Sequence, residues 1–290
     1  MRQNSSISKF DTSNSWVILS PIEQSIKAKI EKVGTPLKDW DINIYRGVLT
    51  GFNDAFIISG EKRQEILNKC TSDDERKRTD ELIRPILRGR DIKRYEYNFA
   101  DLYLINTHNG IKEKNIPRID INDFPAVKKH LDEYWDKIEH RADQGDTPYN
   151  LRNCAYMEDF NKPYIAWIEL TDESKFTYCE NMVALNTVFF LNGEKLFDIL
   201  GMLNSKLILY YFKNCLGTTS GVGTNRWLKF TIEKLPLVHN TPKELEDLVK
   251  RRLKSSENNE FYSNLDEEIN LKVYELYGLT DEEIDFIQRI

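Results

Sequence analysis

Segments typical of β-strands and segments typical of helices are interleaved irregularly along this chain, and no segment repeats another. Runs rich in aromatic and β-branched residues predict strands at 101–107, 164–170, 175–179, 186–191 and 228–237, and two more inside 40–58 around a turn at 50–53. Apolar residues at helical spacing predict helices at 20–33 and 125–138. We also predict helices at 61–83, which is rich in charged residues, and at 194–203 and 206–215. This irregular mixture predicts an α+β fold of mixed, largely antiparallel strands with packed helices.

The last fifty residues carry helix signals only. Thr241-Pro242-Lys243-Glu244 has the residue order of a capping box, and so does Ser20-Pro21-Ile22-Glu23 near the start. Apolar residues at helical spacing follow from Leu265 to Leu276, and Gly278 ends that helix. We therefore expect a main domain at residues 1–240, followed by a helical C-terminal appendage at 241–290.

The acidity of the chain lies in that appendage. The 290 residues have a formal net charge of -6, and residues 241–290 contain seven Lys/Arg against thirteen Asp/Glu. Residues 1–240 therefore have no net charge. Such a domain can still present a basic face, which is the electrostatic signature of nucleic-acid binding.

Several classes of protein find no support in the sequence. Its apolar runs are too short to cross a bilayer, and residues 1–10 have no apolar stretch typical of a secretory signal. The four His residues form no HExxH motif, and the four Cys residues are widely spaced without a CxxC pair. We expect ordinary thiols in a reducing cytosol, and hence a cytoplasmic protein without a membrane partner.

Motifs for catalysis are also missing or weak. The chain has no two adjacent prolines, so it lacks the Asn/Asp-Pro-Pro-aromatic motif of N6-adenine methyltransferases. Its G-x-G at 221–223 lies in a polar loop rather than between a strand and a helix. Glu173-Ser174-Lys175, with Asp159 upstream, resembles the acidic pair plus lysine of metal-dependent nucleases. The same residues are also typical of a hairpin turn facing solvent.

Five segments in order resemble one known family, the TaqI-like C-terminal specificity domains of adenine methyltransferases and of single-chain Type IIG restriction-modification enzymes. The similar stretches begin with residues 16–58 and continue with IRPILRGRDIKRY (83–95), FNKPYIAWIE (160–169), LGMLNSKLILYYF (200–212) and EEINLKVYELYGLTDEEIDFI (267–287). Together they cover nearly the whole chain from Trp16 onwards.

The resemblance implies sequence-specific recognition of double-stranded DNA by a target recognition domain. In this family an adenine-specific DNA methyltransferase and a nuclease lie N-terminal to the specificity domain. We therefore expect this chain to be an excised fragment or a separate subunit that catalyses nothing by itself. S-adenosylmethionine and magnesium are expected for the catalytic parts, and no cofactor is expected in this chain.

The basic stretch at 83–95 is the first candidate for a DNA contact. Lys and Arg side chains bind phosphates and set the register of a protein on the duplex. We predict phosphate contacts for Arg88, Lys93 and Arg94. For the neighbouring Arg90 and Asp91 we predict an ion pair that braces the domain. A salt-bridge network formed by the whole stretch is the alternative.

Two glycine-bearing segments are the candidates for reading bases. At the first, Arg46 precedes the turn Thr50-Gly51-Phe52-Asn53, whose Thr50 and Asn53 have groups that hydrogen-bond to base edges. The second is the polar loop at 216–226, in which we predict DNA contacts for Thr218, Thr219, Ser220, Asn225 and Arg226. The alternatives are a turn stabilised by Asn53 itself and a plain connecting loop.

Two other functions remain open at this level. The first is a small metal-dependent nuclease that uses Asp159, Glu173 and Lys175. The second is a structural interaction module that binds its partner through the helices of 241–290.

Overall fold

The structure is a computed structural model that describes residues 19–216, 218–219, 223–255 and 261–289. Strands and helices are mixed along the chain, and the described sheets are almost entirely antiparallel, which confirms the predicted α+β class. Within the described ranges, no helix has the length and apolar character that crossing a membrane requires.

Strands of the described residues form two four-stranded sheets and two short pairs. The central sheet has the order β2-β9-β6-β7, and the second sheet has the order β3-β5-β4-β8, with β4 and β8 parallel. The short pairs are β1-β12 and β10-β11. The bounds are β1 (Thr35–Pro36), β2 (Ile42–Arg46), β3 (Ile57–Ser59), β4 (Ile83–Leu87), β5 (Leu102–Ile105), β6 (Tyr164–Ile168), β7 (Thr177–Cys179), β8 (Val183–Ala184), β9 (Val188–Gly193), β10 (Thr218–Thr219), β11 (Asn225–Arg226) and β12 (Pro236–Leu237).

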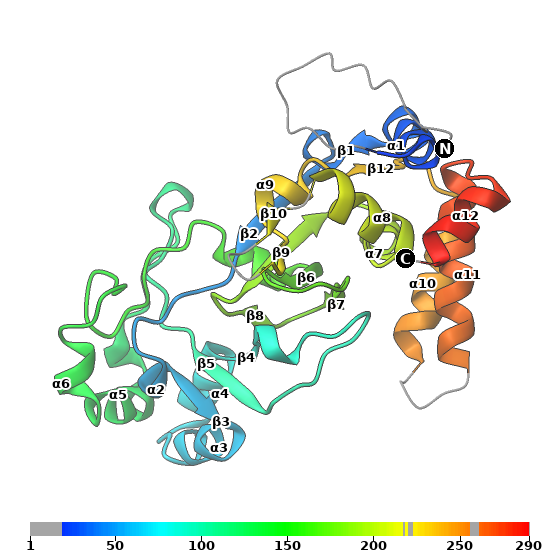
Figure 1. The fold of residues 1–290 in the computed structure, drawn as a ribbon. Coiled ribbons are helices and arrows are strands. Elements are labelled where there is room, and N and C mark those ends of the chain that lie inside the picture. Colours follow the sequence, from blue (N-terminus) through cyan, green and yellow to red (C-terminus); the bar gives the residue numbers. More distant parts are fainter. Residues whose placement is uncertain (1–18, 217, 220–222, 256–260, 290) are drawn as a thin grey trace.

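Helices cover both ends of the molecule, with α5 and α6 at one end and α10, α11 and α12 at the other (Figure 1). The bounds are α1 (Pro21–Val33), α2 (Asn53–Phe56), α3 (Gly60–Asn68), α4 (Asp73–Leu82), α5 (Pro125–Asp132), α6 (Trp135–Ile138), α7 (Leu196–Leu203), α8 (Lys206–Tyr211), α9 (Lys229–Ile232), α10 (Lys243–Lys254), α11 (Phe261–Leu276) and α12 (Asp281–Gln288). The predicted capping box of Ser20 and Glu23 begins α1, whereas α10 begins after Pro242 without a side-chain cap.

The central sheet separates two hydrophobic cores. Successive side chains of a strand point to opposite faces, and β6 follows this rule. Ile165 and Trp167 pack in the first core with α1, α7 and α8, while Tyr164 and Ala166 pack in the second core with β4, β5 and α5. Because both faces are buried, the segment from Tyr164 to Ile168 is a continuous apolar run rather than an alternating one.

The C-terminal helices share the first core. Leu245 and Val249 of α10 are fully buried there, together with Ile269 of α11 and Leu200 of α7. A Cβ added at Gly201 would lie 2.8 Å from Val249 Cγ2, so α7 and α10 approach closely. The segment is helical as predicted, and the domain boundary at 240 stays a prediction.

Two predicted strand regions differ from the structure. The strands predicted inside 40–58 do not pair with each other, because β2 pairs with β9 and β3 pairs with β5 in a different sheet. Between them the chain forms the short helix α2. The strand predicted at 228–237 is instead the helix α9 followed by the two-residue strand β12.

Candidate nucleic-acid interface

Three strands of the central sheet present their ends at the same edge. Arg46, the last residue of β2, lies opposite Phe189 of β9, and Val188 lies opposite Ile168, the last residue of β6. Arg46 Nε donates to the carbonyl of Asn186 at 2.6 Å, and its guanidinium lies 5.5 Å from the centre of the Phe189 ring. Arg46 is therefore held at the sheet end with its charge exposed.

The basic stretch reaches this edge through a tight 3₁₀ turn, Gly89–Asp91. Gly89 N donates to Thr187 Oγ1 at 3.2 Å. A Cβ at Gly89 would lie 3.0 Å from Ile168 Cγ2 and 3.1 Å from Thr187 Oγ1. Glycine thus permits the close approach that fixes this turn against the ends of β6 and β9.

The ion pair predicted between Arg90 and Asp91 is formed by Arg88 and Asp91 instead. Arg88 forms a bidentate ion pair with Asp91, at 2.6 Å from Nε and 2.7 Å from Nη2, so Arg88 rather than Arg90 is the brace. This hydrogen bond raises the pKa of the Arg88 guanidinium. Arg90 is exposed and has no acidic partner among the described residues.

The other two predicted phosphate contacts point elsewhere. Arg94 donates to the carbonyl of Asn204 at 2.8 Å and pairs with Asp266 of α11 at 3.1 Å. It joins the basic stretch to the first core and the C-terminal helices. Lys93 lies 3.5 Å from Glu96 and is partly exposed. Nothing in the structure tests the DNA contacts predicted for Arg94 and Lys93, which stay predictions.

The polar loop begins and ends as a short hairpin, in which Thr218 lies opposite Arg226 and Thr219 opposite Asn225. Ser220 lies outside the described residues. The amide of Asn225 is buried and donates to Asp172 Oδ1 at 3.0 Å. This amide is engaged inside the protein, and its predicted DNA contact stays a prediction.

Arg226 also has an internal partner, Glu169, at 3.0 Å from Nε and 2.5 Å from Nη2. It pairs with Leu170 in an isolated β-bridge just beyond the end of β6. The hairpin therefore adjoins the same sheet end as Arg46 and the 3₁₀ turn. Leu170 itself is 51% exposed.

The first residue of the turn at 50–53, Thr50, is engaged inside the protein. Thr50 is 3% exposed, and its hydroxyl donates to Asn53 Oδ1 at 2.6 Å. Gly51 has φ of 71°, and a Cβ there would lie 2.1 Å from the carbonyl oxygen of Ala142. Asn53 is exposed as the first residue of α2, while Thr50 is buried, and the DNA contacts predicted for both stay predictions.

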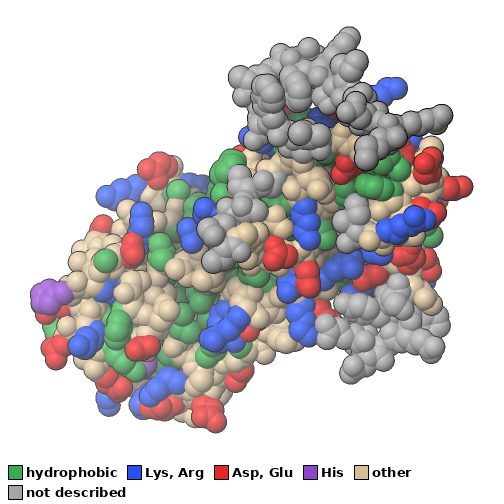
Figure 2. Space-filling model, in the orientation of Figure 1, with side chains coloured by type: hydrophobic (Ala, Val, Ile, Leu, Met, Phe, Trp, Pro, Cys, Tyr) green, Lys and Arg blue, Asp and Glu red, His purple; other side chains and the backbone are tan. Residues whose placement is uncertain are grey.

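We call the edge where these segments meet the sheet-end surface. Its exposed or partly exposed members are Arg46, Arg90, Leu170, Asn186, Thr187 and Arg226. The sequence predictions included Arg46 and Arg226 and missed the other four. The Asn-Thr pair between Leu185 and Val188 was a usable signal, because two polar residues interrupt a run of buried ones. On the face in Figure 2, Lys and Arg are interspersed with Asp and Glu.

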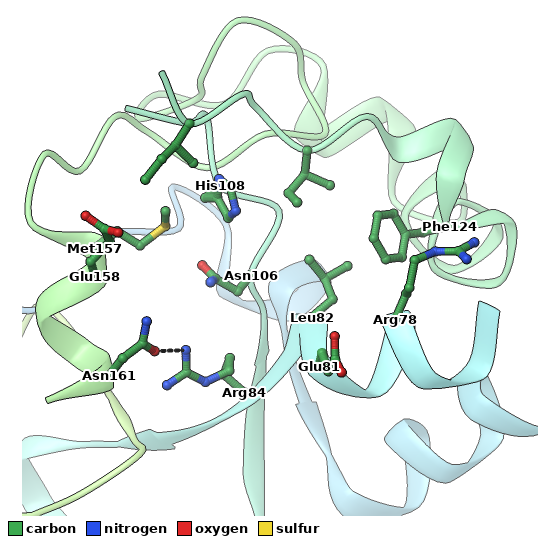
Figure 3. A pocket seen from close by; sticks show the side chains of 12 residues that line it. Arg78, Glu81, Leu82, Arg84, Asn106, His108, Phe124, Met157, Glu158 and Asn161 are labelled. Atoms are coloured by element: carbon green, nitrogen blue, oxygen red, sulfur yellow. Dashed lines mark hydrogen bonds between the residues drawn. The ribbon is translucent and has the colours of Figure 1, made fainter. Parts of the chain in front are cut away.

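Two adjoining cavities, both open to solvent, lie beside each other; we call the one that includes Arg46 the outer cavity and its neighbour the inner cavity. The outer cavity, of about 410 Å³, is lined by Arg46, Arg152 and Tyr156 among others. The inner cavity, of about 400 Å³, has Arg84 and Asn161 in its lining (Figure 3). Both cavities include the residues Asn106, His108 and Met157, so these three stand between them.

The inner cavity contains a half-buried arginine. Arg84 Nη1 donates to Asn161 Oδ1 at 2.7 Å, and no acidic group pairs with Arg84 in the part of the chain that the structure describes. Burial lowers the pKa of this guanidinium below its ordinary value of 12.5, and an arginine still remains charged at neutral pH. The cavity therefore has a fixed positive charge.

His108 is neutral in this site. Burial lowers the pKa of its imidazole, and Gly110 N donates to Nδ1 at 3.2 Å. Because Nδ1 accepts this hydrogen bond, the proton of the neutral ring is on Nε2. His108 thus offers a hydrogen-bond donor without a positive charge.

The residues of the nuclease alternative are not assembled into a metal site. Asp159 pairs with Lys162 at 2.7 Å, and Lys175 pairs with Glu173 at 3.2 Å in the connection between β6 and β7. Among the described side chains, no group of three or more His, Cys, Asp or Glu could hold a metal ion. The structure thus offers no geometry that favours the nuclease.

Comparison by sequence pattern identifies one family. The family described as TaqI-like C-terminal specificity domain matches residues 84–237, which is more than half of the chain. The matched range includes the basic stretch, the central strands β6 and β9 and the polar loop. No curated protein matches the chain.

Two solved structures share the fold. A Type IIL restriction-modification enzyme, MmeI, solved in complex with DNA, matches with a TM-score of 0.58 and 12% identity over 88% of this chain. The type IIG restriction endonuclease BpuSI matches with a TM-score of 0.50 and 15% identity over 90% of this chain. The match covers 36% of the MmeI chain and 33% of the BpuSI chain, so this chain spans about a third of either protein.

Proposed function

The chain belongs to the family of TaqI-like C-terminal specificity domains, and from this premise we propose that it recognises a short sequence in double-stranded DNA. The observation that carries the proposal is the family match over residues 84–237. It is supported by the shared fold with two restriction enzymes, one of them solved in complex with DNA.

The sheet-end surface is the proposed contact with DNA. Arg46 and Arg90 are exposed there without an acidic partner among the described residues, so they can neutralise phosphates. Asn186 and Thr187 lie between them and carry groups suited to base edges. Arg226 is held by Glu169 and serves to position the hairpin.

The proposed biological setting is a restriction-modification system. In it the chain positions DNA for an N6-adenine methyltransferase, which flips an adenine out of the duplex to modify it. The methyltransferase and any nuclease belong to a further part of the protein or to a partner subunit. S-adenosylmethionine and magnesium serve those parts, and this chain has no catalytic role.

The test is DNA binding by a double variant. We expect Arg46→Ala/Arg90→Ala to weaken binding to a pool of 30-bp duplexes with randomised centres by roughly tenfold or more, because two phosphate contacts are lost. The slope of log K against log[salt] should become shallower by about 2. Fluorescence anisotropy at several salt concentrations measures both quantities.

The matched control is Lys32→Ala/Lys38→Ala. These lysines are exposed near the opposite end of β2 and have no acidic partner among the described residues, so the charge lost is the same. The control should bind as the wild type does. Equal losses in the two double variants, or none in either, would contradict the proposed surface.

A further inference from the structure

The inner cavity combines an apolar wall with polar groups. Its apolar lining consists of Leu82, Ile116, Ile119, Phe124 and Met157. Arg84, Asn106 and Asn161 lie near one another on the same side as Met157, whereas Phe124 lies across the cavity (Figure 3). A ligand that fits this cavity has flat or curved apolar faces and a polar edge.

Most of the hydrogen-bonding capacity of these polar groups is unused within the described chain. Arg84 occupies Asn161 Oδ1, which leaves the Asn161 amide N–H groups available. The side-chain amide of Asn106 has no hydrogen-bond partner among the described residues, and His108 presents Nε2–H. Donors therefore outnumber acceptors, and the positive charge of Arg84 adds to the excess.

The acidic groups at the cavity do not cancel its excess of hydrogen-bond donors and positive charge. Glu158 pairs with Lys114 at 2.5 Å, so its charge is already compensated. Glu81 lines the cavity from the end of α4, while Arg78, one turn earlier on the same helix, contributes an opposite charge. Hence the ligand that fits the cavity best has hydrogen-bond acceptors on its polar edge.

The volume of the inner cavity limits which ligands it can hold. A cavity of about 400 Å³ falls in the range of small-molecule sites and far exceeds a lone phosphate ion. It is too small for a duplex, whose major groove alone is about 12 Å wide. A single nucleotide, with an apolar base face and carbonyl or ring-nitrogen acceptors on its edge, meets the size and the chemistry together.

We propose that the inner cavity binds one unstacked nucleotide. The base lies against the apolar wall, and its acceptor edge faces Arg84, Asn161 and His108, with Asn106 able to donate and to accept. The outer cavity connects this site to Arg46 at the sheet-end surface. The proposal deepens the DNA-recognition function and rests on it, since a nucleotide of the bound strand would reach the cavity from that side.

The test uses duplexes that carry a single-nucleotide bulge. A bulged nucleotide is already unpaired, so the few kcal/mol of unpairing is largely removed, and we expect the wild type to bind a bulged 30-bp duplex roughly tenfold tighter than the matched duplex. Bulges of G and T, whose edges carry carbonyl oxygens, should be preferred over A. Fluorescence anisotropy with the same flanking sequence measures the ratio.

Two cavity variants and one control complete the design. Asn106→Leu and Asn161→Ala should each bring the ratio of bulged to matched affinity close to one, while binding of the matched duplex stays as in the wild type. Asn161 is exposed, so its variant should fold even if Asn106→Leu does not. Asn43→Leu, an exposed change at the far end of β2, should keep the preference.

The outcomes separate this proposal from the proposed function. Equal binding of bulged and matched duplexes by the wild type overturns the nucleotide site and leaves DNA recognition standing. A preference that survives in both cavity variants also overturns the site. A chain that binds no duplex, but whose Asn106 and His108 NMR signals shift with nucleoside monophosphates, supports a site for free nucleotides and overturns DNA recognition. Failure to bind any of these probes overturns both.

Discussion

Arg88 and Arg90 flank one glycine and have opposite environments. In a 3₁₀ turn, residues three positions apart eclipse each other, which brings Asp91 beneath Arg88 and leaves the adjacent Arg90 in solvent. From the sequence of residues 83–95 we expected one arginine to form an ion pair with Asp91 and another to remain exposed. The sequence could not show which arginine pairs with Asp91, because this depends on the type of turn rather than on the order of the residues.

Asp266 of α11 joins two arginines from different parts of the chain. It accepts from Arg252 Nε at 2.7 Å and pairs with Arg94 at 3.1 Å, and the side chain of Arg252 is fully buried. The ring of Tyr95 lies between these arginines, at 5.4 Å from Arg94 and 4.9 Å from Arg252. Removing Asp266 therefore takes one carboxylate from two partly or fully buried cations.

We expect Asp266→Ala to lower the free energy of unfolding by about 3 kcal/mol or more, as breaking a buried ion pair does. Urea denaturation measures this change. Glu268→Ala is the matched control on the same helix, because Glu268 pairs with Arg251 at 3.8 Å on the surface and should change stability by about 0.5 kcal/mol or less. An equal decrease of the free energy of unfolding in both variants would mean that the buried ion pairs stabilise the protein no more than the surface pair does.

At the scale of elements, predictions from sequence were best where local signals and packing agree. The predicted capping box of Ser20 and Glu23 forms and begins α1. The predicted strand at 228–237 was wrong although its apolar residues alternate. Phe230 is 51% exposed while Ile232 is fully buried, so packing around α9 outweighs the local pattern.

Glu283 gives the docking of α12 onto α1 a pH dependence. It accepts from Ser25 Oγ and from Lys29 Nζ, each at 2.7 Å, and from the backbone of Thr280. Burial acts to raise its pKa, but these hydrogen bonds outweigh burial and the pKa lies below its ordinary value near 4.5. A carboxyl with a lowered pKa in the folded state stabilises the protein above its unfolded pKa, and this contribution is lost as the pH falls through the folded value.

We therefore expect Glu283→Gln to flatten the decline of stability below pH 4.5 while reducing stability at pH 7. Thermal melts from pH 7 to pH 3 follow both effects. Glu282→Gln, which alters an exposed neighbour in the same helical turn, is the control and should keep the wild-type slope. A Glu283 variant with an unchanged acid slope would show that the contact does not set the pH response.

At the scale of the whole molecule, the fold class could be predicted from the sequence, but the sharing of one sheet by two cores could not. The apolar run at β6 is compatible with a buried strand or with a buried helix segment. Only the packing of α7 and α8 on one face and of β4, β5 and α5 on the other explains why Tyr164 to Ile168 are apolar throughout.

The segments of the candidate site could be predicted from the sequence, but their exposed side chains could not. Arg46, the basic stretch and Arg226 were singled out from the sequence, and the structure brings Arg46, the 3₁₀ turn of that stretch and Arg226 to one sheet end. Which of their side chains remain exposed could not be predicted, because the acidic partners Glu169 and Asp172 come from a distant segment.

A chain ending at residue 240 should not fold by itself. Removing α10 to α12 exposes apolar surface of α7 and α8 in the first core, which includes the fully buried Leu200 and Leu207. We expect this truncated chain to show no cooperative thermal transition by near-UV circular dichroism. Adding residues 241–290 as a peptide should restore the transition. A cooperative transition without the peptide would instead support an independent domain at 1–240.

The burial of both faces of the central sheet also limits how much of a duplex this surface can touch. DNA cannot lie across the sheet, so only the row of strand ends remains for it. Three neighbouring strand ends span about 10 Å, since adjacent strands lie about 4.8 Å apart. Base pairs are stacked about 3.4 Å apart, so the strand ends face a stretch of about three base pairs.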